Sequence, residues 1–166
     1  MKNLTSVLFL FLTLISFSCS IDVLPPTLGQ LILGNWKCSE IEVEGTQINK
    51  LSELEYLVEG NDTFLDLTFT FSEDPKVVIT EGDADVEFRL VLGEEILQQN
   101  EFKQKDIIEE TAWSIQGEKL VFEDGSEFTN LVIDENQLVM EHKVKTSQMS
   151  GLDDMDVTYK FYFEKK

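Results

Sequence analysis

The strict alternation of apolar and polar side chains is the feature that most constrains the fold of this chain. From Leu65 to Phe71, every second side chain is Leu or Phe, and the side chains between them are Asp or Thr. Residues 85–92, 138–145 and 156–164 repeat the pattern. A period of two with one polar face is typical of antiparallel β-strands. The pattern therefore predicts a chain built mainly of antiparallel strands.

Short connections with turn-forming residues separate these apolar runs. Asp124-Gly125 is the strongest hairpin signal, because glycine supplies the positive φ that a type I′ turn requires. Further turns are predicted at Glu73-Asp74-Pro75, Glu81-Gly82-Asp83, Gly117-Glu118 and Asp134-Glu135-Asn136. Successive hairpins give an up-and-down meander, and about eight such strands usually close into a barrel, which removes exposed edges. We therefore expect an all-β fold, an antiparallel up-and-down β-barrel of about eight strands.

One short helix is predicted after the first strand. Ser52-Glu53-Leu54-Glu55 has the form of a capping box, in which hydroxyl and carboxylate satisfy reciprocal backbone donors, and Gly60 would end the helix. Residues 94–102 leave two alternatives open, a helical turn or a long loop.

The N-terminal segment has the composition of an export signal. Lys2 precedes an apolar run, Leu4 to Phe17, that is too short to span a bilayer as a mature helix. The small Ser18 directly before Cys19 resembles the lipobox of bacterial lipoproteins. The resemblance implies that residues 1–18 are removed and that Cys19 carries a lipid. The alternative is an ordinary secretory signal with an incidental cysteine.

The two cysteines, Cys19 and Cys38, bear on the same question. If Cys19 is lipidated, Cys38 has no partner and no disulfide forms, whereas the alternative pairs the two in an oxidising periplasm. Cys38 shares a strand face with Trp36 and is expected to be a small core residue. We expect residues 19–31 to form a lipidated tether and residues 32–166 the barrel domain.

The charge balance limits the partners of this chain. Asp and Glu number 32 against 13 Lys and Arg, which gives a net charge of −19. Nucleic acid is an unsuitable partner, because no basic patch could displace the counterions of phosphate. Electrostatic docking on anionic lipid is disfavoured for the same reason. The charge favours solubility and mutual repulsion, so we expect a monomer that contacts the membrane through its N-terminal lipid.

A family resemblance begins at Leu33-Gly34-Asn35-Trp36-Lys37. Its Gly-x-Trp resembles the start of the lipocalin fold, where the tryptophan closes one end of the barrel. Residues 113–122 and 133–141 are similar to the small lipocalin-like lipoproteins of Gram-negative bacteria. Classical lipocalins also stack an arginine near the last strand on this tryptophan, whereas the only arginine here is Arg89 and Lys165 is the substitute. The resemblance implies a lipocalin-like barrel with Gly34 and Trp36 as structural residues at its end, on an outer-membrane lipoprotein facing the periplasm or the cell surface.

Catalytic and metal chemistry find little support in the sequence. His142 is the only histidine, and neither a Gly-x-Ser-x-Gly elbow nor a glycine-rich phosphate loop is present. One histidine and Cys38 are too few soft ligands for zinc. Two acidic clusters lack the spacing of a calcium loop and are expected to be solvated turns: Glu81, Asp83, Asp85 and Glu87, and Asp153, Asp154 and Asp156. We therefore expect no enzyme, no cofactor and no metal.

Inward-facing aromatic residues leave two functions open. A small barrel can use such side chains to fill itself or to line a cavity. By their common strand parity, a cavity for a small apolar molecule is predicted at Phe69, Phe88, Trp113, Met140, His142, Tyr159 and Phe161. His142 could instead be a core histidine bonded to a neighbour such as Tyr159. The alternative function is a non-catalytic protein-interaction module with a filled barrel.

Overall fold

The computed structural model describes residues 25–49, 51–147 and 154–166. The predicted signal segment 1–18, the lipidation site Cys19 and the acidic residue Asp153 lie outside these residues. The described chain contains a short helix followed by eight strands. Their bounds are α2 Leu28–Leu31, β1 Gly34–Ile48, β2 Glu55–Phe71, β3 Val77–Leu92, β4 Glu95–Gln116, β5 Lys119–Phe122, β6 Glu127–Ile133, β7 Gln137–Ser147 and β8 Asp154–Lys165.

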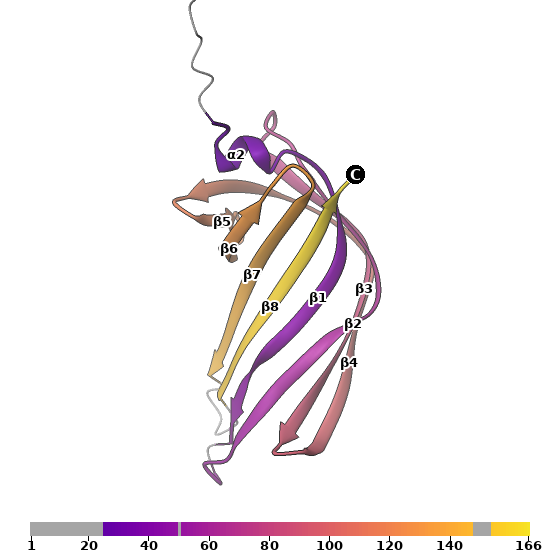
Figure 1. Ribbon diagram of the computed structural model, residues 1–166, viewed down its shortest axis with the longest axis vertical. Helices are drawn as coiled ribbons and strands as arrows, with labels where there is room; N and C mark the ends of the chain where they lie inside the picture. The colour runs from indigo at the N-terminus through magenta and orange to yellow at the C-terminus, as the bar shows by residue number, and fades with distance from the viewer. Residues whose placement is uncertain (1–24, 50, 148–153) are drawn as a thin grey trace, which may run out of the picture.

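The eight strands form an antiparallel up-and-down barrel (Figure 1). Each strand pairs with the next along the chain, and the pairing of β1 with β8 closes the ring. The segments predicted from alternation lie within β2, β3, β7 and β8. The predicted eight-stranded barrel is confirmed. It forms because period-two patterning and short turns permit neighbouring strands to pair in sequence order.

The barrel is closed more completely at one end than at the other. The ladder between β4 and β5 covers Trp113–Gln116 only, and the ladder between β6 and β7 ends at Phe128 and His142. Within the described ranges, residues 95–111 of β4 pair with β3 but have no strand ladder on the other side. Figure 1 shows β5 and β6 across the upper part of the barrel, with the lower parts of β4 and β7 apart. As far as the described residues show, the lower barrel is therefore a curved sheet whose two edges, on β4 and β7, have no partner strand.

Trp36 closes the upper end of the barrel. Its side chain is 0% exposed, and its Nε1 donates a hydrogen bond of 2.6 Å to the carbonyl oxygen of Ile32, just after α2. A buried indole N–H requires such an acceptor. The Lys165 ammonium lies 5.0 Å from the centre of the indole ring, where the resemblance places an arginine. Gly34 precedes this site with a φ of +117°, a conformation that glycine adopts without strain.

The helix predicted after the first strand is wrong. Residues 51–54 form the turn of the β1–β2 hairpin, and Glu55 already pairs with Ile48. The Asn49 side chain accepts backbone hydrogen bonds from Leu51 and Ser52, each 3.0 Å long. The local capping signal loses to the long β1–β2 ladder, which satisfies more backbone groups than one helical turn could. The described helix lies instead in the predicted tether.

Two predicted connections are strand in the structure. Residues 95–102, expected as a helical turn or loop, belong to β4, which follows a turn at Gly93. The predicted turn at residues 81–83 lies inside β3, where Gly82 has a φ of +119°. A Cβ at Gly82 would lie 1.7 Å from the carbonyl oxygen of Asp66. The glycine therefore marks an irregularity where two strands approach closely. Glycine permits such a close approach within a strand just as it permits a turn.

Candidate ligand cavity

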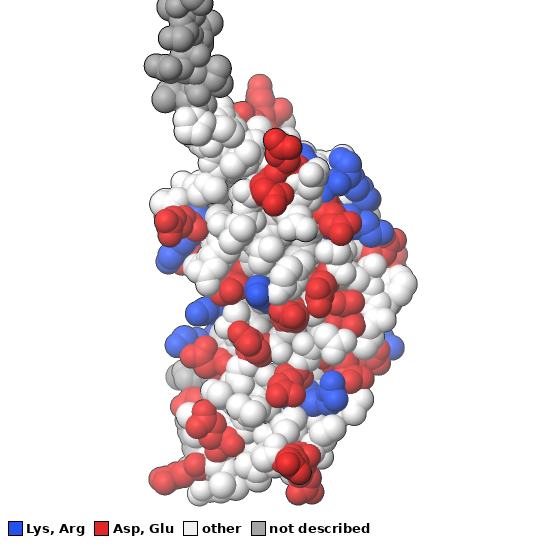
Figure 2. Space-filling view, in the orientation of Figure 1, with Lys and Arg blue, Asp and Glu red and all other residues white. Residues whose placement is uncertain are grey.

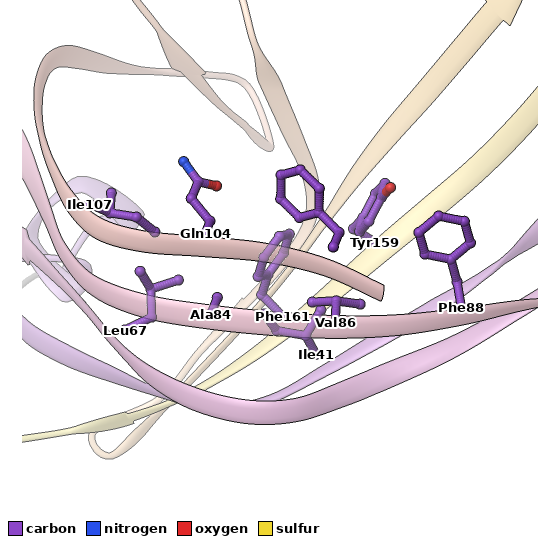
Figure 3. A pocket seen from close by; sticks show the side chains of 10 residues that line it. Ile41, Leu67, Ala84, Val86, Phe88, Gln104, Ile107, Tyr159 and Phe161 are labelled. Carbon is purple, nitrogen blue, oxygen red and sulfur yellow. The ribbon is translucent and has the colours of Figure 1, made fainter. Parts of the chain in front are cut away.

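A cavity of about 340 Å³ lies inside the barrel (Figure 3). Its wall is built from β1, β2, β3, β4 and β8, because inward side chains of these strands converge there. The lining residues are Ile41, Leu67, Ala84, Val86, Phe88, Phe102, Gln104, Ile107, Tyr159 and Phe161. This volume is near the lower bound for small-molecule sites, about 300–1,000 Å³.

The cavity wall is apolar except for Gln104 and Tyr159. Among the described residues, no charged side chain lines it. The Tyr159 hydroxyl and the Gln104 carboxamide form no hydrogen bond to another residue in the described part of the chain. Burial raises the pKa of Tyr159, so its phenol remains protonated at ordinary pH. The site can therefore offer neutral donors and acceptors to a ligand.

Phe102 locates the mouth of the cavity. It lines the cavity and yet is 56% exposed to solvent. It belongs to the part of β4 that has no ladder on its second side within the described ranges, and its partner on β3 is Val86 in the cavity wall. The cavity therefore opens beside β4 through the flank of the barrel, while Trp36 covers the upper end.

The structure brings three of the residues expected from parity, Phe88, Tyr159 and Phe161, into the cavity wall. It places three other residues of the predicted set, Phe69, Trp113 and Met140, in the packed upper core. Phe69 packs on Phe163 with ring centres 5.0 Å apart, and Met140 is fully buried. Strand parity specifies the face on which a side chain lies but not its depth along the barrel.

Trp113 also lies in the upper core. Its ring meets Phe71 edge to face at 5.7 Å between centres. Its Nε1 donates to the carbonyl oxygens of Ser72 and Val77, each at 3.1 Å. Trp113 therefore ties β4 to the β2–β3 connection, as a packing residue with a satisfied polar group.

His142 does not line the cavity. Its Nδ1 is 2.9 Å from the carbonyl oxygen of Glu127, which can only accept, so this nitrogen carries the proton. Its ring contacts Phe128, with 5.1 Å between centres. Tyr159 is its cross-strand neighbour, but the hydrogen bond is made to the β6 backbone. The geometry fits a core histidine bonded to a neighbour.

Sequence reasoning missed the contribution of β4. The register shift between Gly82 and Ala84 places two β4 residues, Lys105 and Asp106, opposite one β3 residue, so Gln104 and Ile107 both face the cavity. Asp106 has a φ of +53° at this bulge. Phe102 and Gln104 are two positions apart, and this spacing predicts that they share a face of β4. The bulge after Gln104 interrupts the spacing, so it does not extend to Ile107. Ile41, Leu67, Ala84 and Val86 were also missed.

The remaining chemical candidates are held in structural roles. Cys38 is 1% exposed, and burial raises the pKa of its thiol to about 12, which suppresses the nucleophilic thiolate. Asp83 and Asp85 contact the Lys105 ammonium at 3.7 and 2.9 Å. Among the described residues, no group of three or more His, Cys, Asp and Glu side chains is arranged to hold a metal ion. No helix in the same residues is long and apolar enough to cross a membrane.

Comparison with known proteins gives no match to a family model, to a curated protein or to a solved structure. The cavity and its surroundings are therefore the basis for a functional proposal.

Proposed function

We propose that this chain is a membrane-anchored lipoprotein whose lipocalin-like barrel binds a small apolar molecule in the cavity. The observation that carries the proposal is the apolar cavity of about 340 Å³, which opens to solvent at Phe102 beside an otherwise packed core. Apolar concave sites with a few polar groups are the usual form of small-molecule sites. The Ser18-Cys19 pattern supports the lipid anchor, and the Gly34-x-Trp36 motif supports the lipocalin likeness.

The expected affinity follows from the chemistry of the wall. Burial of apolar surface contributes about 2.5 kcal/mol for each 100 Å² removed from water. Association and ordering offset much of this gain, which leaves a dissociation constant of about 1 μM for a ligand that fills the cavity. Binding should also raise the melting temperature with ligand concentration, since the ligand binds the folded state.

The test is titration with N-phenyl-1-naphthylamine, a neutral dye whose fluorescence rises in apolar surroundings. We expect saturable binding by the wild type and its loss in Ala84→Phe, which places a ring in the cavity. Ile108→Phe is the matched control, since Ile108 is on the same sheet but 78% exposed. Absence of saturable binding, for this dye and for the ligands used below, would overturn the proposal.

A protein-interaction role is the second candidate, and one observation favours it. The tips of the β1–β2 and β3–β4 hairpins lie together at the lower end of the barrel (Figure 1). Their exposed apolar residues are Ile48, Leu51, Leu54, Leu57, Leu92, Ile96 and Leu97. Acidic side chains surround this end, as Figure 2 shows on one face. Such a patch suits a partner with apolar and basic side chains.

Photo-crosslinking in cells would test the second candidate. A photoreactive residue at position 96 should give a discrete crosslinked species, whereas one at the exposed Val132 of β6 should not. Equal crosslinking from both positions would indicate nonspecific contacts and would argue against a docking surface at the hairpin tips.

A further inference from the structure

We propose that the cavity selects uncharged ligands that carry a hydroxyl or carbonyl group, and that it rejects apolar anions and cations of the same size. This inference rests on the proposed function and specifies its ligand class. It follows from the charges near the cavity and from the polar groups in its wall.

In the part of the chain that the structure describes, neither cations nor carboxylates line the cavity. The cationic side chains adjacent to lining residues along the chain are Arg89, Lys103, Lys105 and Lys160. Arg89 and Lys103 pair with Glu87 and Glu101, at 3.8 and 3.0 Å, and the Lys160 ammonium lies 4.9 Å from the centre of the Tyr162 ring. Lys105 is held on the outside of the barrel, with its Nζ 2.9 Å from the Asp85 carboxylate and 4.6 Å from the centre of the Phe64 ring. A carboxylate in the cavity would therefore be buried without a counter-charge, which is strongly unfavourable.

The surrounding charge adds to this exclusion of anions. The Asp62 carboxylate lies next to β1, where it accepts a 2.8 Å hydrogen bond from the backbone N–H of the lining residue Ile41. The whole chain carries a net charge of −19, and acidic side chains are spread over the face in Figure 2. The net negative charge of the chain therefore disfavours the approach of anions.

A bound cation would meet a different difficulty. The nearby Asp62 carboxylate is already engaged by the Ile41 backbone, and no carboxylate of the described residues lines the cavity. An ammonium group would lose its hydration without gaining a directly opposed charge. The acidic surface can raise the local concentration of cations, but the wall gives them no site of contact.

The polar groups in the wall match a neutral ligand group. Figure 3 shows the Gln104 carboxamide and the Tyr159 hydroxyl pointing to the same side of the view, away from Leu67, Ala84 and Val86. Gln104 lies on β4 next to the mouth and Tyr159 on β8. Both groups donate and accept hydrogen bonds, so either a hydroxyl or a carbonyl of the ligand can be satisfied there.

The test uses 2-naphthylmethanol, 2-naphthoate and 2-naphthylmethylammonium, which share one ring system and differ in charge. Binding to the full processed protein in lipid nanodiscs is measured at pH 7, with empty nanodiscs as the blank. We expect the alcohol to bind at least about tenfold more tightly than either ion. Binding of the anion or the cation as tightly as the alcohol would overturn the inference while leaving the proposed function standing.

Two variants examine the contacts themselves. Tyr159→Phe removes only the hydroxyl, so the affinity for 2-naphthylmethanol should fall about fivefold while that for 2-methylnaphthalene is unchanged. Gln104→Lys places a cation in the wall and should increase the affinity for 2-naphthoate at least about tenfold. Gln99→Lys, an exposed substitution on the same strand with the same charge change, should not. Equal effects of the two lysine variants would contradict the inferred site. If no naphthalene ligand and no dye binds, the proposed function falls as well.

Discussion

Trp36 shows how one side chain can organise the end of a barrel. Its indole is fully buried, its N–H is satisfied by the Ile32 carbonyl, and Lys165 covers the ring from the last strand. The side chain thus joins the residues after α2, the start of β1 and the end of β8. Cys38, two residues further along β1, continues the same buried face.

Trp36→Ala should lower the free energy of unfolding by about 3–5 kcal/mol, because it leaves a large cavity in a packed barrel end. Urea denaturation followed by circular dichroism measures the change. Lys165→Met, which keeps most of the stem over the ring, should cost less than about 1 kcal/mol. A loss below about 1 kcal/mol for Trp36→Ala would show that the ring does not contribute to a packed core.

The Cys38 thiol should react with a disulfide reagent only after unfolding. Burial both blocks access and raises the pKa of this thiol to about 12, so little thiolate forms at pH 8. Titration with Ellman's reagent in buffer and in guanidinium chloride measures the reactivity. Rapid labelling of the native Cys19→Ala variant, in which Cys38 is the remaining cysteine, would contradict the burial. A protein that shows no thiol even when unfolded would instead indicate the Cys19–Cys38 disulfide.

At the scale of elements, glycines and bulges shape the barrel where the alternation is interrupted. Gly82 permits β2 and β3 to approach closely, and the bulge at Lys105-Asp106 in β4 lies opposite this region. The bulge turns Gln104 and Ile107 to the same face, so it directly forms part of the cavity wall. The free edge of β4 carries Glu101 and Lys103, paired at 3.0 Å, and charged side chains on an edge oppose strand-to-strand aggregation.

Gly82→Ala should lower the free energy of unfolding by at least about 2 kcal/mol, because it combines a positive φ with a backbone clash. A Cβ there would meet the Asp66 carbonyl oxygen at 1.7 Å. Gly93→Ala is the matched control, since Gly93 also has a positive φ but no atom within 4 Å of a Cβ. Its cost should be about 1 kcal/mol. Equal costs in thermal or chemical denaturation would show that the close approach does not matter.

At the scale of the whole molecule, α2 and the closed end of the barrel lie together, whereas the cavity mouth opens through the flank. The described chain enters at α2 beside the Trp36 end, and both lie at the upper end in Figure 1. A lipid on Cys19 would hold this end towards the membrane, leaving the hairpin tips on the far side. The mouth at Phe102 opens through the flank and not at the upper end.

Cys19→Ala should move the protein from the membrane fraction to the soluble fraction. Lipidation with several acyl chains anchors a protein stably, whereas the acidic surface gives no electrostatic attraction to anionic lipid. Fractionation of cells that express the variant and the wild type measures the distribution. Ser20→Ala is a control that keeps the cysteine. Full membrane retention of Cys19→Ala would refute lipid anchoring at this residue.

The local sequence was sufficient for the strands and for most turns. The alternation from Leu65 to Phe71 and the Asp124-Gly125 turn specify strand and hairpin through interactions between near neighbours. The same local reasoning failed at residues 52–60, where a capping box competes with the β1–β2 ladder and loses. It also failed at Gly82, because a glycine that permits a turn equally permits a close approach inside a strand.

Local alternation specifies which side chains face inward, whereas pairing between distant strands specifies which of these side chains border a cavity. Phe69, Met140 and Phe88 share the inward face, but only Phe88 lines the cavity. Depth along the barrel depends on register and on where β5 and β6 cover the ring, and both are set by pairing between distant segments. The bulge that brings Gln104 and Ile107 to the wall arises from the same pairing. An alternating pattern specifies the face of the sheet on which each side chain lies. It does not specify the register between strands or the position of bulges, so the cavity is defined only when all strands are paired.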